Sequence, residues 1–291
     1  MPHLTSRDAA NLFRRPPDRF IDVGEGEVAY RKVGDGPDVL FVHGWPVSGA
    51  TFRHLLPRLA ETFTCHIIDL VGAGESRFDK DTRIDIAQHI ENLRRVADAL
   101  AFSDFAVVGH NSGGMMARHA FASDPRLRAM GLVNTEQPQG LAWPFRRLLL
   151  MSKLPRFPDI LGWTVMQPRL RKHSMLLGEC FTDRALIDGE FEEFFLSPLH
   201  RDAKRRWAAG QLVRSFDTQF VSDLAVVHRQ IHVPVQLVWG EDDPFFPVGW
   251  AREMVETFPN ARLHVVPKAK LFCHEERPDE VAKALASTLL G

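Results

Sequence analysis

The chain has 291 residues, a length that suits one large domain or two small ones. Its 36 Lys and Arg residues are offset by 37 Asp and Glu residues, so the formal net charge is -1 and a basic surface for nucleic acid is not expected. Hydrophobic residues make up 45% of the chain and charged residues 25%, which is typical of a folded globular protein and excludes a disordered one.

The sequence also lacks the patterns of several other protein classes. No run of about 18 uncharged apolar residues occurs, so no membrane-spanning helix is expected. The N-terminal residues are rich in arginine and have no apolar run, which does not fit a secretory signal. Cys65, Cys180 and Cys273 lie far apart and form no CxxC motif. We therefore expect no disulfide framework, no metal site and a cytoplasmic location.

Strand-like and helix-like segments alternate along the first part of the chain. Short β-rich or apolar runs predict strands at residues 28–33, 39–43, 64–70, 105–109 and 127–134. Helices are predicted between or after them, at residues 51–60, 84–100 and 115–122. The same alternation resumes near the C-terminus, with strands at 235–239 and 262–266 and helices at 248–258 and 278–289. Nearly continuous apolar strands that alternate with helices predict a mostly parallel sheet covered on both faces.

The segment between these two parts has a different character. Residues 137–228 contain no convincing strand, and prolines and aromatic residues punctuate short helical stretches. We expect residues 1–136 and 229–291 to form an α/β core and residues 137–228 to form a helical lid. In α/β folds, ligands bind at the carboxyl ends of the strands, so a lid inserted there would cover the binding site.

The most informative motif is the run VVGHNSGG at residues 107–114. A strand leads into a tight turn with small residues around it, and a helix follows, as in a nucleophile elbow. The spacing small-x-nucleophile-x-small fits residues 109–113 and places Asn111 at the tip of the turn. Centring the motif on Ser112 would require a small residue at position 110, but the residue there is His110.

With this motif, the chain resembles the α/β-hydrolase superfamily, in the branch of haloalkane and haloacetate dehalogenases and soluble epoxide hydrolases. The resemblance covers nearly the whole chain and depends on five motifs in order: HGWP at 43–46, GAGES at 72–76 after Asp69, the elbow, WGEDDPFFP at 239–247 and FCHEERP at 272–278. It implies a mostly parallel eight-stranded sheet with helices on both faces and a helical lid. It also implies a small-molecule substrate and no cofactor.

The resemblance assigns a role to several positions. The backbone N–H groups of Trp45 and Ser112 would stabilise an oxyanion or a halide. Asp243 matches the acid that orients the catalytic histidine, and Glu136 matches the alternative position of that acid in some dehalogenases. His43 and His110 fall at structural positions beside the oxyanion loop and the elbow.

Two positions depart from the family pattern. The elbow carries Asn111 where the family has Asp, Ser or Cys, and a neutral carboxamide is a poor nucleophile. Leu271 stands where the family has the histidine that activates water. His274 lies three residues further on and is the one candidate for a substitute base, if a helical turn brings it onto the same face as Leu271.

Two hypotheses about function concern the pocket, and a third is that the lid docks on a membrane or on a partner protein. The first is a hydrolase-like enzyme that acts on a small, largely apolar molecule with a non-standard site. The alternative is a catalytically silent protein of the same fold that binds a ligand or has a regulatory role. The resemblance disfavours epoxide hydrolysis, because epoxide hydrolases use tyrosines of the lid to protonate the epoxide oxygen. The only tyrosine of this chain is Tyr30, which lies outside the expected lid. Residues 145–154 could lie on a membrane surface, but we favour a lid helix whose apolar face covers the pocket and expect no membrane partner.

Overall fold

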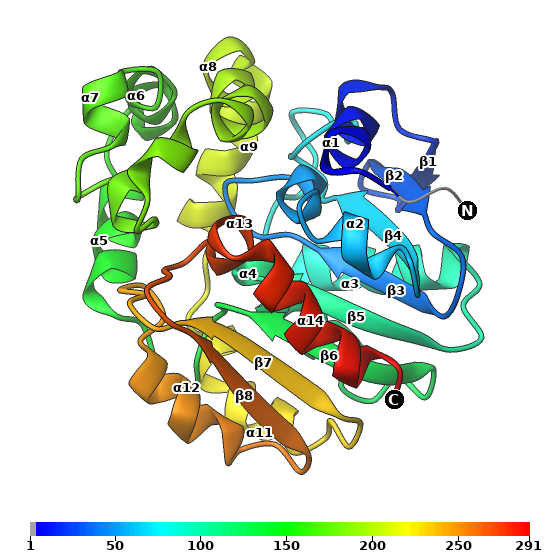
Figure 1. The fold of residues 1–291 in the computed structure, drawn as a ribbon. Helices are drawn as coiled ribbons and strands as arrows, with labels where there is room; N and C mark the ends of the chain where they lie inside the picture. The colour runs from blue at the N-terminus through cyan, green and yellow to red at the C-terminus, as the bar shows by residue number, and fades with distance from the viewer. Residues whose placement is uncertain (1–3) are drawn as a thin grey trace.

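A computed structural model describes residues 4–291 and contains one eight-stranded sheet. The strands lie in the order β1-β2-β4-β3-β5-β6-β7-β8 (Figure 1). Strand β2 runs antiparallel to both of its neighbours, and all other adjacent strands are parallel. The strands are β1 (Arg19–Asp22), β2 (Glu27–Val33), β3 (Asp38–Val42), β4 (Thr64–Asp69), β5 (Phe105–His110), β6 (Leu127–Val133), β7 (Val235–Gly240) and β8 (Ala261–Val266). The predicted mostly parallel eight-stranded sheet is therefore confirmed.

Helices cover both faces of this sheet. Those outside the segment between β6 and β7 are α1 (Ser6–Arg14), α2 (Leu56–Leu59), α3 (Ile86–Ala99), α4 (Ser112–Phe121), α12 (Val248–Val255), α13 (Cys273–Glu276) and α14 (Pro278–Leu289). The side chains of β5 show why two layers form, because Val107 packs with α3 and α4 while Val108 packs with α2 and α14. Successive side chains of a strand point to opposite faces, so an all-apolar strand requires cover on both sides.

The pattern-based predictions differ from the structure in two places near the N-terminus. Helix α1 and strand β1 were not among the segments that periodicity indicated. A capping box between Thr5 and Asp8 starts α1. The helix expected at 51–60 is divided into a 3-10 turn, Gly49–Phe52, and the short helix α2. Pro57 lies in the first turn of α2 and cannot donate the backbone hydrogen bond that would join the two pieces.

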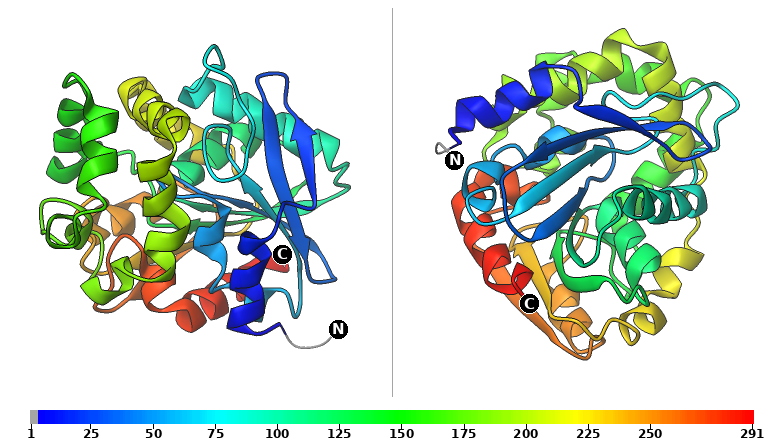
Figure 2. Two further views of the ribbon diagram at one scale, coloured as in Figure 1. Left: turned by 90° about the horizontal axis from the view of Figure 1, so that it is seen from above. Right: turned by 90° about the vertical axis from the view of Figure 1, so that its right-hand side faces the viewer.

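The segment between β6 and β7 is helical, as expected. Its α-helices are α5 (Trp143–Ser152), α6 (Phe157–Thr164), α7 (Pro168–Arg171), α8 (Ser197–Arg201), α9 (Ala203–Arg214), α10 (Gln219–Ser222) and α11 (Leu224–His228). The 3-10 turns Leu177–Glu179 and Arg184–Ile187 and the π-helical turn Glu192–Leu196 lie among them. Figures 1 and 2 show α5–α9 gathered at one side of the sheet. Within residues 4–291, no helix has the length and apolar content needed to cross a membrane.

Candidate functional site

A sharp turn connects β5 to α4 and has Asn111 at its tip. The backbone of Asn111 has φ 53° and ψ -139°, a conformation that residues other than glycine rarely adopt. Such a residue carries strain of order 1–3 kcal/mol, which the surrounding structure must offset. A Cβ atom on Gly113 would lie 2.3 Å from the carbonyl oxygens of Val42 and His43, so β3 and α4 approach too closely for a side chain there. The small residues of the motif therefore allow the turn to form.

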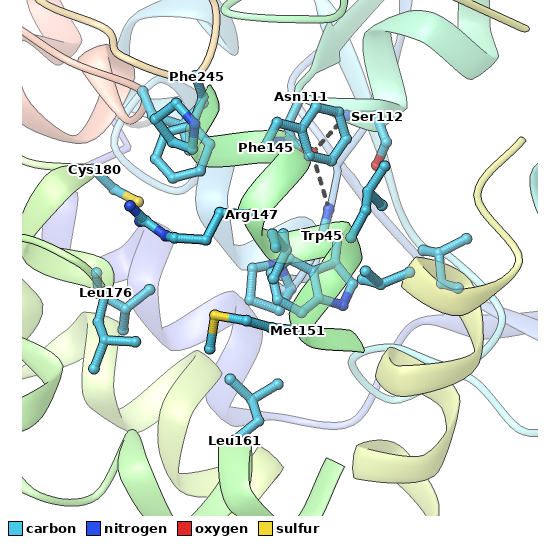
Figure 3. Close-up of a pocket in the computed structure, with 18 of the residues that line it drawn as sticks. Trp45, Asn111, Ser112, Phe145, Arg147, Met151, Leu161, Leu176, Cys180 and Phe245 are labelled. Atoms are coloured by element: carbon cyan, nitrogen blue, oxygen red, sulfur yellow. Dashed lines mark hydrogen bonds between the residues drawn. The ribbon is translucent and has the colours of Figure 1, made fainter. Parts of the chain in front are cut away.

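The side chain of Asn111 is held by the two backbone amides that were expected to form an oxyanion site. Its Oδ1 accepts hydrogen bonds from Ser112 N at 2.6 Å and from Trp45 N at 3.3 Å (Figure 3). Gly44 makes this possible, because a Cβ atom there would lie 2.6 Å from Oδ1. Because Oδ1 faces the two backbone amides, the Nδ2 amide group points away from them. Nδ2 has no hydrogen-bond partner among residues 4–291. The carboxamide thus occupies the expected oxyanion site and leaves one N–H donor group free.

Asn111 lies at the wall of a cavity of about 130 Å³ between the core and the helical segment that joins β6 to β7. Most of the lining side chains are apolar, and Phe145, Met151 and Leu161 from this helical segment are seen in Figure 3. Besides Trp45 and the thiol of Cys180, the polar lining residues are Asn111, Ser112, Arg147, Thr164 and Arg171. No histidine, aspartate or glutamate lines this cavity in the described part of the chain. The site therefore offers hydrogen-bond donors in an apolar enclosure and no general base.

Leu271 and Phe272 also line the cavity, so a leucine side chain faces the site where the family histidine was expected. The imidazole of His110 lies behind this segment, with Nε2 3.1 Å from the Leu271 carbonyl oxygen. His274 packs against His110 with ring centroids 4.3 Å apart, and its Nε2 is 2.7 Å from Thr51 Oγ1. His274 does not reach the cavity, which corrects the suggestion that it shares the face of Leu271. The short helix α13 directs it toward Thr51 instead.

The histidines near the turn after β5 are buried and form hydrogen bonds with neighbouring segments. His43 has Nδ1 2.9 Å from the Gly44 carbonyl oxygen, and its Nε2 accepts a hydrogen bond from Leu70 N at 2.8 Å. Burial lowers the pKa of His43, lowers that of His110 to about 3, and lowers that of His274 well below its ordinary value. Each of these imidazoles is therefore neutral at pH 7.

The two acids that the resemblance singled out lie in the interior and do not line the cavity. Asp243 accepts hydrogen bonds from Asn134 Nδ2 at 2.5 Å and from Phe245 N at 2.8 Å. Burial raises the pKa of Asp243 to about 7, against the lowering effect of these hydrogen bonds. Asn134 thus donates to the acid where the family pattern places an imidazole. Nothing in the sequence pointed to this role except the position of Asn134 at the end of a predicted strand.

Glu136 is fully buried and receives a hydrogen bond from Thr135 Oγ1 at 3.0 Å. Its Oε1 has no partner among residues 4–291, and burial raises its pKa. The neighbouring Arg118 is also fully buried and donates to the backbone oxygens of Gly114 and Glu136 and to Thr135 Oγ1. This arginine, which sequence reasoning missed, joins the elbow helix to the segment after β6.

Two arginines of the helical segment between β6 and β7, which the sequence did not single out, also line the cavity. Arg147 donates to Glu179 at 2.6 Å, and Arg171 donates to Asp188 and Glu192 at 2.5 and 2.7 Å. Their charges are therefore balanced within the same segment. The described residues contain no group of His, Cys, Asp and Glu side chains that could hold a metal ion.

Comparisons with known proteins agree on the fold. The model of the alpha/beta hydrolase fold family matches residues 37–278. A pimeloyl-[acyl-carrier protein] methyl ester esterase from Chromobacterium violaceum is 27% identical over 88% of this chain and 96% of its own length. Haloalkane dehalogenase 2 from Mycobacterium tuberculosis is 25% identical over 92% of this chain and 93% of its own. A loop variant of haloalkane dehalogenase DbeA from Bradyrhizobium elkanii superposes with a TM-score of 0.77 at 19% identity, covering 94% of this chain and 96% of that chain, which shows the shared fold alone.

Proposed function

Because the chain belongs to the alpha/beta hydrolase fold family, we propose that it binds a small, largely apolar molecule beneath its lid without hydrolysing it by the family's nucleophile–histidine–acid route. This is the second of the two functions that the sequence left open for the pocket. The observation that carries it is the position of the Asn111 carboxamide, whose oxygen accepts the hydrogen bonds of the Trp45 and Ser112 backbone amides.

The carboxamide opposes hydrolysis in two ways. It has no electron pair comparable to that of a carboxylate or an alkoxide, so it is a poor attacking group. It also fills the site where a substrate oxyanion would form, and each donor in such a site can be worth about 3–4 kcal/mol of barrier. In well-studied triad hydrolases, loss of the nucleophile or the base lowers the rate on the order of 10⁶-fold.

The same geometry supports ligand binding. The free Nδ2 group of Asn111 is a donor at the wall of an apolar cavity, and Ser112 Oγ has no partner in the described structure although Ser112 lines the same cavity. An apolar molecule would gain about 25 cal/mol for each Å² of surface that it buries. A single carbonyl, ether or halogen acceptor on it would accept from Nδ2 and fix its orientation. The printed names of the relatives, methyl ester esterases and haloalkane dehalogenases, support a ligand of this size and polarity.

We further propose that residues 137–228 form the lid and that residues 1–136 and 229–291 form the core. The support is that the cavity is lined both by the turn after β5 and by α5 and α6. A cytoplasmic location is part of the proposal, since Cys65, Cys180 and Cys273 are free thiols in the structure.

A binding and turnover experiment on the whole chain tests this function. Thermal shift and calorimetry would use a homologous pair of probes, a medium-chain methyl ketone and the alkane of the same length. We expect the ketone to raise Tm, and Asn111→Ala to weaken ketone binding by about tenfold, which corresponds to the loss of one hydrogen bond. The variant should bind the alkane as the natural chain does. Turnover of p-nitrophenyl esters, epoxides or 1-haloalkanes above the Asn111→Ala background would overturn the proposal, and so would an absence of binding to both probes.

The hydrolase-like function remains a second candidate on one observation, the unpartnered hydroxyl of Ser112 beside the cavity. Attack by this hydroxyl would need a base, and the imidazoles of His110 and His274 lie behind Leu271. Ser112→Ala distinguishes the two functions, because ester turnover that disappears in this variant and survives in Asn111→Ala would assign the reaction to Ser112.

A further inference from the structure

The outer surface of the lid exposes an unusual set of large apolar side chains. Seven of the ten large hydrophobic side chains that are exposed in the described structure belong to residues 143–176. They are exposed by 39% to 65%, and one of them, Met175, also lines the cavity. The other six do not line it and are called the lid surface here: Trp143, Leu150, Leu154, Ile160, Trp163 and Leu170. Isolated exposed apolar residues are normal, but their concentration on one part of a chain marks an interaction site.

Covering the cavity does not account for the lid surface. In α5, Phe145, Leu148 and Leu149 line the cavity, whereas Leu150 is 58% exposed. The cavity-lining function expected for residues 145–154 from the sequence therefore explains one face of α5. Within residues 4–291, the side chains of Trp143 and Leu150 in α5 remain largely exposed, so this part of the helix is available to an outside partner.

Cations without an acidic partner lie near the lid surface. Residues 143–176 contain seven Lys and Arg residues, of which Arg147, Arg171 and Lys172 form ion pairs with acids at positions 179, 188 and 192. Lys153, Arg156 and Arg169 are exposed and make no ion pair within residues 4–291. Lys153 is adjacent to Leu154 and Arg169 is adjacent to Leu170. The cations are thus interspersed with the exposed apolar side chains.

We propose that the lid surface docks on an anionic lipid bilayer. Tryptophan and leucine side chains would enter the boundary between headgroups and acyl chains, and the unpaired cations would contact lipid phosphates. Exposed apolar side chains distributed over α5, α6 and α7, with cations between them, match a fluid anionic surface better than a rigid partner, which requires a complementary continuous patch. Figures 1 and 2 show these helices at the edge of the molecule, away from β1 and β2, so a flat surface can approach them.

Docking would also bring the cavity close to the bilayer. The helices that carry the lid surface line the cavity with Leu148, Met151 and Leu161. If the ligand-binding function proposed above is correct, an apolar ligand dissolved in the membrane could reach the cavity through this part of the lid. Docking itself does not depend on that function, and its test uses no ligand.

Co-sedimentation of the full chain with vesicles tests the proposal. Vesicles of phosphatidylcholine alone are compared with vesicles that also contain phosphatidylglycerol, at low and high salt. We expect binding to the anionic vesicles that weakens with salt. The triple variant Lys153→Ala/Arg156→Ala/Arg169→Ala should weaken it by more than about tenfold, and the double variant Leu154→Ser/Trp163→Ser should weaken it at both salt concentrations.

A matched control has the same kinds of change in α11 and the residue after it, where Val226 is 50% exposed and Arg229 is exposed. The variant Val226→Ser/Arg229→Ala should bind vesicles as the natural chain does. Absence of binding to anionic vesicles at low salt would overturn the proposal, as would equal losses in the lid and control variants. Sedimentation equilibrium without lipid tests the alternative that a second copy of the chain covers the lid surface. That alternative is assigned if the natural chain forms a dimer and does not bind vesicles, and if Leu154→Ser/Trp163→Ser abolishes the dimer.

Discussion

The side-chain amide of Asn134 donates a 2.5 Å hydrogen bond to Asp243 Oδ2. The oxygen of the same amide accepts hydrogen bonds from Gly240 N and Cys273 Sγ at 3.1 Å each, which fixes the orientation of the Asn134 side chain. The hydrogen-bond partner of Asp243 is therefore a neutral amide, which carries no positive charge to balance an ionised carboxylate. Burial raises the pKa of Asp243 to about 7. An acid that would be ionised beside a histidinium is close to half protonated at neutral pH here.

Stability should depend on pH through Asp243. Its pKa of about 7 in the folded chain lies above the value near 4 of an unfolded chain, so the folded state holds the proton more tightly. Its contribution to stability is complete below about pH 4 and is lost as the pH rises to about 7, by an amount on the order of a few kcal/mol. Urea unfolding of the natural chain and Asp243→Asn at several pH values measures this effect.

The difference in unfolding free energy between the two proteins is the decisive quantity, because the buried histidines contribute equally to both. We expect the stability of the natural chain relative to the variant to fall between about pH 4 and pH 7. A difference that stays constant over this range would show that Asp243 titrates with an ordinary pKa.

Replacing Asn111 with aspartate should create a nucleophile in a site that cannot complete the reaction. One carboxylate oxygen would keep the hydrogen bonds from Ser112 N and Trp45 N, and the other would take the position of Nδ2 at the cavity. With a 1-bromoalkane, that oxygen would form an ester to the alkyl carbon and release bromide. The alkyl-enzyme should accumulate because no described histidine lines the cavity to activate water. Intact mass spectrometry would detect one added alkyl group for each chain.

The control for this trapping experiment adds Leu271→His, which places an imidazole at a cavity-lining position. In the double variant, we expect bromide release beyond one equivalent and a smaller population of adduct. Asn111→Gln offers no carboxylate and should give neither. If Asn111→Asp remains unmodified by a bromoalkane that binds in the cavity, the turn does not direct the side chain as a nucleophile elbow does.

Gly113→Ala should destabilise the fold strongly. The added Cβ would lie 2.3 Å from two backbone oxygens of the segment 42–43, which cannot rotate away as a side chain would. Inserting atoms into such a packed contact typically costs about 1–3 kcal/mol or more. Gly249→Ala in α12 is a matched change, because a Cβ there meets nothing within 4 Å and alanine favours a helix. Thermal unfolding should show a large decrease in Tm for the first variant and no decrease for the second.

Arg118→Met should also lower the free energy of unfolding, by about 3–5 kcal/mol, since it leaves several buried acceptors without a donor. The acceptors are the backbone oxygens of Gly114 and Glu136 and the hydroxyl of Thr135. Denaturant unfolding measures the loss, with the exposed Arg229→Met as a control that should change stability by less than about 0.5 kcal/mol. Equal unfolding midpoints for the two variants would contradict the role assigned to Arg118.

The sequence by itself determined the sheet and led to the prediction of a non-standard site at the turn after β5. Apolar strands such as 105–109 require cover on both faces, and this local pattern indicated the fold correctly. The identities of Asn111 and Leu271 are covalent facts, so the hypothesis that the usual nucleophile and histidine are replaced at those positions needed no coordinates.

Only the tertiary structure decided where the remaining polar groups lie. The direction of His274 depends on how α13 packs against Thr51, and the partner of Asp243 comes from Asn134, more than a hundred residues away. Spacing along the chain carries no information about such long-range contacts, because packing of the whole core sets them. The same holds for the exposure of Trp163 and Leu154 between β6 and β7, because the sequence pattern does not distinguish a buried apolar residue from an exposed one until its neighbours are known.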